Sequence, residues 1–407
     1  MSLSRPWLIK DQNRQMIETV GFILAALVGI MIGINLNKFK IERKNLKRLE
    51  KLNHSYFKGL NYLLNDDSER AIDVFIELAK TSNETFEPQL ALGNLYRRKG
   101  EVDKAIKLHQ SLISQPNLPE SYRTKALLAM GKDYMSAGLL DRAEVLFTEL
   151  VEIEAYTPEA LYSLCEIYQQ EKDWDEAIKS ASRYQIVSGR KMAKDIAHFN
   201  CELAEKCLKE NNAKEAQGYL TSALSINPKC VRAKLIEARE FQKNKKWKKA
   251  IDAYHAALAF DDVYASEYID EMSYCYSQIK KCAQFKVFLL EFIQSYQGIS
   301  PVLVLAQMYK HDEGIEKAEK FVEEQLIEKP SVRGLDLLLK LNLEKNAQSP
   351  DDVTKFQVLE QLVNKLLAQK PNHRCRKCGF GAKKLHWQCP SCKSWGSVKP
   401  IYGLETE

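Results

Sequence analysis

An alanine recurs at nearly constant intervals through the middle of this chain, and this repetition limits the fold more than any other feature. The successive intervals are 34, 38, 34, 39 and 34 residues, followed by a gap of twice 34. A chain with this periodicity folds as a stack of similar supersecondary units rather than around one central core. The alanines are Ala71, Ala105, Ala143, Ala177, Ala216, Ala250 and Ala318.

A period of 34 residues is typical of tetratricopeptide repeats, in which each unit is a pair of helices. A compact residue stands twelve positions before each alanine, where the two helices of one unit must touch. We therefore expect an all-α solenoid of about eight repeats over residues 52–330, with one unit near Gln284 that has lost its markers. The compact residues are Gly59, Gly93, Gly131, Cys165, Ala204, Ala238 and Ala306.

A solenoid of helix pairs presents a groove lined by the first helix of each unit, and such a groove can bind a peptide or a protein. Eight polar residues in predicted first helices are candidates for this partner groove, although for any single one of them a solvated helix face is the favoured interpretation. They are Asn94, Arg97, Lys132, Glu166, Gln169, Arg232, Arg239 and Gln242. Residues 331–372 are predicted to form helices that cap the repeats.

The last segment, residues 373–407, contains two C-x-x-C pairs, Cys375/Cys378 and Cys389/Cys392, with ten residues between the inner cysteines. Each pair brings two thiolates within reach of one ion, so the segment is predicted to bind one metal ion in a tetrahedral four-thiolate site. Iron and zinc both accept these ligands, and the spacing does not choose between them. Two disulfides or four reduced thiols are the alternatives, and a structural role for the metal is favoured over a redox role.

The N-terminal part contains an apolar run from residue 20 to residue 34 that extends to residues 17–36, long enough for one transmembrane helix. A cleaved signal peptide is the alternative, but a basic segment follows over residues 37–51 and no small-residue cleavage site is present. The positive-inside rule places the short tail of residues 1–16 on the non-cytoplasmic side and the rest of the chain in the cytoplasm. In a bacterium, the membrane would then be the inner membrane.

Small residues recur every four positions on the predicted membrane helix, where another helix, in a partner or in a second copy, could approach closely. Ordinary glycine usage in membrane helices is the alternative explanation. These residues are Gly21, Ala25, Gly29 and Gly33. The sequence leaves homo-oligomerisation open.

The net charge of +6 is concentrated at the basic segment and in the cysteine-rich end, while the repeats between them are mildly acidic. The basic residues of the cysteine-rich segment are therefore expected to contact an acidic partner or the repeats themselves. They are Arg374, Arg376, Lys377, Lys383, Lys384 and Lys393. The chain contains no glycine-rich phosphate loop, H-E-x-x-H or nucleophile elbow, so enzymatic activity is not expected.

The segment CRKCGFGAKKLHWQCPSCKSWGSVKPIYGL resembles the C-terminal module of the bacterial lipopolysaccharide assembly protein B family. The membrane anchor and the repeats extend this resemblance over nearly the whole chain. The resemblance implies an inner-membrane adaptor that limits lipopolysaccharide synthesis by presenting the deacetylase LpxC to the membrane protease FtsH, and that could scaffold other lipopolysaccharide assembly proteins. It also implies a rubredoxin-like, iron-binding module whose ligands are Cys375, Cys378, Cys389 and Cys392.

Two other classes of function compete with an adaptor. A basic zinc ribbon with aromatic residues can bind nucleic acid, although the membrane anchor and the acidic repeats make nucleic acid an unfavourable partner. A rubredoxin-type iron could transfer electrons. The adaptor remains the interpretation that uses every part of the chain.

Overall fold

The computed structural model describes Met31, Ile34 and residues 36–40, 43–44, 54–65, 67–81, 86–345 and 350–404. Apart from Met31, Ile34 and Leu36, the predicted membrane helix and its small residues Gly21, Ala25, Gly29 and Gly33 lie outside this part of the chain. Within the described ranges, no helix is both long enough and apolar enough to span a bilayer. The chain divides into two compact units, Met1–Ala160 and Leu161–Glu407.

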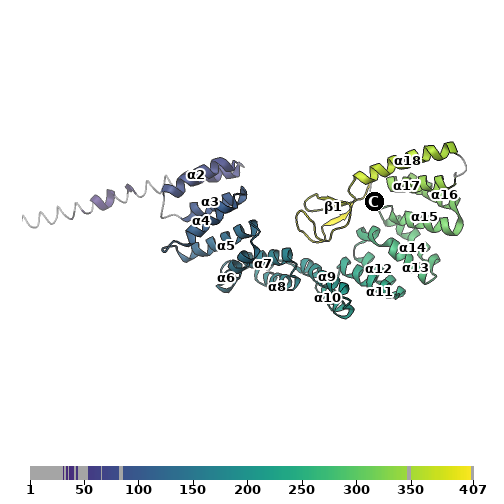
Figure 1. Cartoon of the computed structure of the whole chain (residues 1–407), viewed down its shortest axis with the longest axis horizontal. Coiled ribbons are helices and arrows are strands. Elements are labelled where there is room, and N and C mark those ends of the chain that lie inside the picture. The colour runs from purple at the N-terminus through teal and green to yellow at the C-terminus, as the bar shows by residue number, and fades with distance from the viewer. Residues whose placement is uncertain are drawn as a thin grey trace, which may run out of the picture. The chain divides into compact units, whose positions relative to one another are not determined.

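The first unit consists of antiparallel helix pairs (Figure 1). In each pair the second helix carries one of the recurring alanines, and Ala71, Ala105 and Ala143 are fully buried. The helical pairing that the period predicts is therefore confirmed. After a helical stretch over residues 54–64, the helices are α2 (Ser68–Thr81), α3 (Phe86–Arg98), α4 (Val102–Ile113), α5 (Glu120–Ser136) and α6 (Leu140–Glu152), and α7 (Thr157–Glu171) crosses the boundary between the units.

The compact residue of each pair allows the two helices to touch, as the sequence predicts. A Cβ atom on Gly131 would lie 2.7 Å from the ring of Phe147, and one on Gly59 would lie 2.8 Å from the ring of Phe75. Real Cβ atoms do not approach other heavy atoms this closely, so the aromatic ring four residues after the alanine fills the space that glycine leaves open.

In the second complete pair this aromatic position is occupied by His109, which is fully buried against Gly93. Its Nδ1 lies 2.5 Å from Oδ2 of Asp133, which is also fully buried. Arg97 Nη1 donates to the other oxygen of Asp133 over 2.7 Å, and Nη2 donates to Asn94. The buried carboxylate is thus satisfied from both sides.

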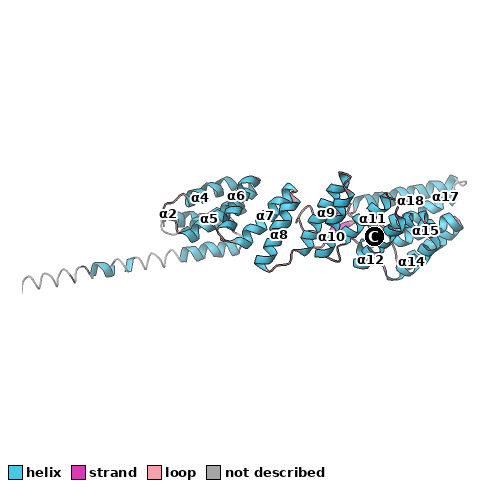
Figure 2. Ribbon diagram, turned by 90° about the horizontal axis from the view of Figure 1, so that it is seen from below, coloured by secondary structure: helices cyan, strands magenta, loops and turns pink. Residues whose placement is uncertain are grey.

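The second unit continues the helix pairs and ends in a small sheet (Figures 1 and 2). Ala177, Ala216, Ala250 and Ala318 are again buried in the second helices. The helices are α8 (Trp174–Ser188), α9 (Ala193–Lys209), α10 (Ala213–Ile226), α11 (Val231–Lys243), α12 (Trp247–Phe260), the 3-10 helix η1 (Asp262–Glu267), α13 (Ile269–Gln278), α14 (Cys282–Ser295), α15 (Ser300–Glu313), α16 (Ile315–Glu328), α17 (Val332–Lys345) and α18 (Pro350–Gln369).

The repeat that has lost its sequence markers is also irregular in structure. Its first helix is divided into η1 and the short helix α13, and Tyr268, the residue between them, stacks its ring on Tyr254. In its second helix Gln284 is exposed, whereas Phe285 is fully buried. The buried position has moved by one residue, which explains why the 34-residue register fails there.

Three short antiparallel strands follow α18 and form a sheet in the order β2-β1-β3. The strands are β1 (His373–Cys375), β2 (Gly381–Ala382) and β3 (Val398–Pro400). Cys375 pairs with Val398 across β1 and β3, so the first cysteine stands at the end of the central strand. We refer to residues 373–404 as the metal module.

Candidate metal centre

Two tight turns of similar geometry carry the four cysteines of the metal module. In the first, the N–H of Gly379 donates to the carbonyl of Cys375 over 3.0 Å, and in the second the N–H of Lys393 donates to the carbonyl of Cys389 over 2.9 Å. The residue that closes each turn has a positive φ, 79° at Gly379 and 56° at Lys393. Glycine adopts this conformation without strain, so the sequence marks the first turn but not the second.

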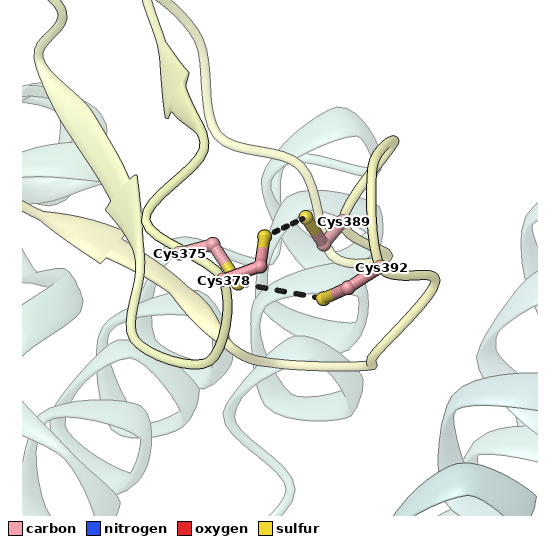
Figure 3. Close-up of side chains that lie close together, drawn as sticks. All are labelled: Cys375, Cys378, Cys389 and Cys392. Carbon is pink, nitrogen blue, oxygen red and sulfur yellow. Dashed lines mark hydrogen bonds between the residues drawn. The ribbon is translucent and has the colours of Figure 1, made fainter. Parts of the chain in front are cut away.

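The two turns bring all four sulfur atoms to within 4.8 Å of one another (Figure 3). Cys375 and Cys392 are separated by 3.7 Å between their sulfurs, and so are Cys378 and Cys389. Four thiolates about 2.3 Å from a tetrahedral ion stand about 3.8 Å apart, whereas the sulfurs of a disulfide stand about 2.05 Å apart. All four cysteines are free, so the arrangement fits a single four-coordinate metal ion rather than two disulfides.

The surroundings of the sulfurs differ. Burial acts to raise the pKa of Cys375, but the Ser397 hydroxyl and the backbone N–H groups of Cys378 and Lys377 outweigh it and lower the pKa to about 6. Burial raises the pKa of Cys389 to about 11. A bound cation would therefore be needed to hold Cys389 as a thiolate at neutral pH.

The metal module has almost no apolar core of its own. Its buried cluster consists of Cys375, Cys389 and Val398, with Phe380 and Leu385 partly buried beside them. So little buried surface does not offset the cost of ordering about 30 residues. Metal binding, and contact with the helices of the second unit, would supply the missing stability.

Trp395 is the centre of that contact. It is 4% exposed, and its Nε1–H donates to the side-chain oxygen of Gln169 in α7 over 2.9 Å. Its ring stacks on His198 with the centroids 5.2 Å apart, and Trp174 and Phe199 meet it edge-on. An aromatic side chain held on all sides in this way resembles a binding hot spot within a single chain.

Arg232, in α11, completes the set of side chains that pack around Trp395. The guanidinium lies 5.8 Å from the Trp395 ring and is 4% exposed. It donates to Glu202 over 2.8 Å and to Glu205 over 3.0 Å, so its buried charge is balanced by two carboxylates of α9.

The other end of the module is attached to η1 and α17. Lys399 forms an ion pair with Asp261, and the hydroxyl of Tyr402 donates to the carbonyl of Val263 over 3.1 Å. The N–H of Val332, at the start of α17, donates to the carbonyl of Leu404 over 2.7 Å. The irregular repeat thus holds strand β3 and Tyr402, and α17 holds Leu404.

The predicted groove residues of the second unit are largely engaged by the chain itself. Gln169 and Arg232 contact the metal module, Arg239 pairs with Glu271 over 2.9 Å, and Gln242 accepts a hydrogen bond from Tyr254 over 2.8 Å. Glu166 is partly buried in α7. Whether any of these residues binds a partner remains a prediction.

In the first unit, Asn94 and Arg97 belong to the network around Asp133, and Lys132 is partly buried beside it.

Sequence reasoning missed three residues of the contact with the metal module, Trp174, His198 and Tyr264. The available signal was weak, since each is an aromatic or histidine at a position that the repeat pattern does not require.

Comparison with known proteins agrees with this architecture. A family model described as "Rubredoxin metal binding domain" matches residues 373–400, and a tetratricopeptide repeat model matches residues 90–121. The "Lipopolysaccharide assembly protein B" of Escherichia coli K12 is 33% identical over 355 residues, which cover 87% of this chain and 91% of that protein.

The protein of the same name from Haemophilus influenzae is 30% identical over 363 residues, with the same coverage of 87% and 91%. Among solved structures, the crystal structure of MamA protein has 17% sequence identity and a TM-score of 0.35, over 44% of this chain and 93% of that one.

Proposed function

Because this chain belongs to the lipopolysaccharide assembly protein B family, we propose that it is a non-enzymatic adaptor of the bacterial inner membrane. In this proposal it limits lipid A synthesis by presenting the deacetylase LpxC to the protease FtsH. The observation that carries the proposal is the similarity to the E. coli protein, which spans both the repeats and the metal module.

The fold supports an adaptor because helical repeats offer long surfaces for protein partners. The histidines and cysteines that could act as catalytic groups have structural roles in this chain. His109 and His198 are buried, and the four cysteines of the module converge on one metal position. We propose that the metal, iron or zinc, holds the module in shape.

Residues 17–36 are proposed to anchor the chain, with the repeats on the cytoplasmic side. The support is the apolar run itself and the basic residues after it. The Gly21, Ala25, Gly29 and Gly33 stripe would then be available to a helix of the protease or of a second copy.

The proposal is tested in a strain that lacks the native gene and is complemented with the full chain, with a chain lacking residues 1–36, or with the Cys389→Ser variant. LpxC is quantified by immunoblot, with and without depletion of FtsH. We expect the full chain to keep LpxC low, and both altered chains to let it rise to the level seen after FtsH depletion.

Cys282→Ser is the matched control, because Cys282 is a free cysteine in α14 outside the metal module. It should keep LpxC as low as the full chain does. LpxC that is equally low in the strain without any chain would contradict the proposal.

A further inference from the structure

A polar cavity of about 500 Å³ lies where the metal module meets the repeats. Lys383, Lys384 and Trp387 line it from the module, while Arg239 and Glu267 line it from the repeats. Its size falls within the range of about 300–1,000 Å³ usual for small-molecule sites. All these residues belong to the second unit.

The lining of the cavity is strongly basic. Four of the residues around it are cationic, Arg239, Arg333, Lys383 and Lys384, and the only carboxylate among them is Glu267. Glu267 already lies 2.8 Å from Nε2 of His373. The four cations therefore outnumber the single carboxylate in the wall of the cavity, which leaves an excess of positive charge.

The four cationic side chains differ in the partners that they already have within the chain. Arg239 pairs with Glu271 through its Nε over 2.9 Å, and Arg333 donates to the hydroxyl of Ser300 over 3.3 Å. Lys383 and Lys384 are exposed side by side just after β2, and within the described part of the chain neither forms an ion pair. These two ammonium groups are therefore free to move onto an anion.

A second observation concerns His373, which also lines the cavity. The residue is 6% exposed, and its Nδ1 is buried without a hydrogen-bond partner. Nδ1 itself is closed off from solvent, so it is not available to a molecule in the cavity, and His373 contributes to the site only through its bond to Glu267.

We propose that this cavity binds a phosphate group, presented either by a small soluble phosphate compound or by a phospholipid headgroup. A phosphate has several acceptor oxygens and close to two negative charges, which suits two lysines and neighbouring guanidinium groups better than a single carboxylate does. A confined cavity favours one such group over an extended polymer. The inference does not depend on the role of LpxC or FtsH.

A bound phosphate would join the two parts of the second unit. Lys383 and Lys384 belong to the metal module, whereas Arg239 and Arg333 belong to α11 and α17. An anion between them would strengthen the docking of the module and raise the stability of the loaded chain by mass action.

The test uses the full metal-loaded chain in a neutral detergent and titrates it with inorganic pyrophosphate in a calorimeter. We expect saturable binding at one site per chain, weakened by added salt. The double variant Lys383→Gln/Lys384→Gln should bind at least about tenfold more weakly, since two charge-assisted contacts are lost. Both lysines are exposed, so the variant should retain its metal and its fold.

The matched control is Arg190→Gln/Lys191→Gln, which removes two adjacent exposed cations from the loop between α8 and α9. It should bind pyrophosphate as the unaltered chain does. Equal weakening in both double variants would show general charge attraction and would overturn the proposal.

A second arm replaces pyrophosphate with dioctanoyl phosphatidic acid, with dioctanoyl phosphatidylcholine as the reference lipid. Saturable binding of pyrophosphate, lost in the Lys383/Lys384 variant, assigns the site to soluble phosphates. Binding of phosphatidic acid alone, lost in the same variant, assigns it to a lipid headgroup. Absence of saturable binding in both arms overturns the inference and leaves the LpxC experiment unaffected.

Discussion

Trp395 and Gln169 are 226 residues apart in the chain and share a hydrogen bond of 2.9 Å. The indole stands in the metal module, and the amide stands in the first helix of a repeat near the start of the second unit. This bond orients the Trp395 ring, and the stacked rings around it supply the buried surface.

We expect Trp395→Ala to weaken the docking of the metal module by about 3–5 kcal/mol, because a large buried side chain is lost. Trp395→Phe and Gln169→Ala should each cost about 1 kcal/mol, and the double variant should cost little more than either alone. The measurement is hydrogen exchange across residues 373–404 in the metal-loaded chain. Unchanged exchange in Trp395→Ala would show that the module is held by other contacts.

Gly131 should not tolerate a methyl group. Gly131→Ala places a Cβ 2.7 Å from the Phe147 ring, and overpacking of this kind costs about 1–3 kcal/mol. Gly218→Ala is the control, because Gly218 is an exposed helical glycine with no atom within 4 Å of its Cβ position. It should stabilise α10 by about 0.5–1 kcal/mol. Calorimetric melting that shifts in the same direction for both variants would contradict the role given to Gly131.

Asp133→Ala should destabilise the first unit by about 3–5 kcal/mol, because it leaves His109 and Arg97 without their shared carboxylate. Other repeats fill the position of His109 with Phe75 or Phe147, so His109→Phe/Asp133→Leu should restore most of that loss. Urea unfolding of the single and double variants measures the difference. A double variant that is as unstable as Asp133→Ala would show that the network is not replaceable by apolar packing.

Acid should destabilise the second unit partly through His198. Burial, with the nearby charges of Arg232 and Lys194, lowers the pKa of His198 to about 3, whereas an unfolded histidine titrates near about 6.5. Between these values the unfolded chain binds the extra proton, so stability falls as the pH decreases from about 6.5 towards 3, by up to about 1.4 kcal/mol per pH unit.

His198→Phe keeps an aromatic ring against Trp395 but cannot be protonated. Over roughly two pH units below neutrality, its free energy of unfolding should depend less steeply on pH than that of the unaltered chain. Equal slopes would mean that the buried histidine does not control the acid sensitivity of the second unit.

The purified chain should contain one metal ion per molecule, and removing it should unfold residues 373–404 first, since their own apolar core is small. Elemental analysis gives the metal and its stoichiometry, and hydrogen exchange after chelation gives the region that unfolds. Cys389→Ser should reproduce the metal-free state, whereas Cys282→Ser should not. Full protection of the module after complete removal of the metal would contradict a structural role for the ion.

The repeats and the four-cysteine site could be predicted because both depend on short-range spacing. Alanines such as Ala105 and Ala250 are buried in second helices, and Gly59 and Gly131 stand where two helices touch. In each case a small residue is required because a neighbouring helix of the same repeat packs closely against it. The C-x-x-C pairs likewise bring their sulfurs together through local turns.

The docking of the module could not be predicted, because it depends on pairs far apart in sequence, such as Trp395 with Gln169 and Lys399 with Asp261. The turn at Lys393 could not be predicted either, because a positive φ is uncommon for lysine and the residue type does not indicate it. Near Gln284, where the register failed, the repeat without markers has a divided first helix, and the η1 part of that helix contacts the module. In a repeat array, a unit that loses its pattern is therefore worth inspecting as a contact site.

The attachment of the metal module at both Gln169 and Val332 fixes the number of repeats between them. Helical arrays usually lengthen or shorten by whole units at little cost. Here, one unit more or less between α7 and α17 would carry one of these residues out of reach of the module. We therefore expect homologous chains that keep both attachments to vary in repeat number only outside the span between α7 and α17.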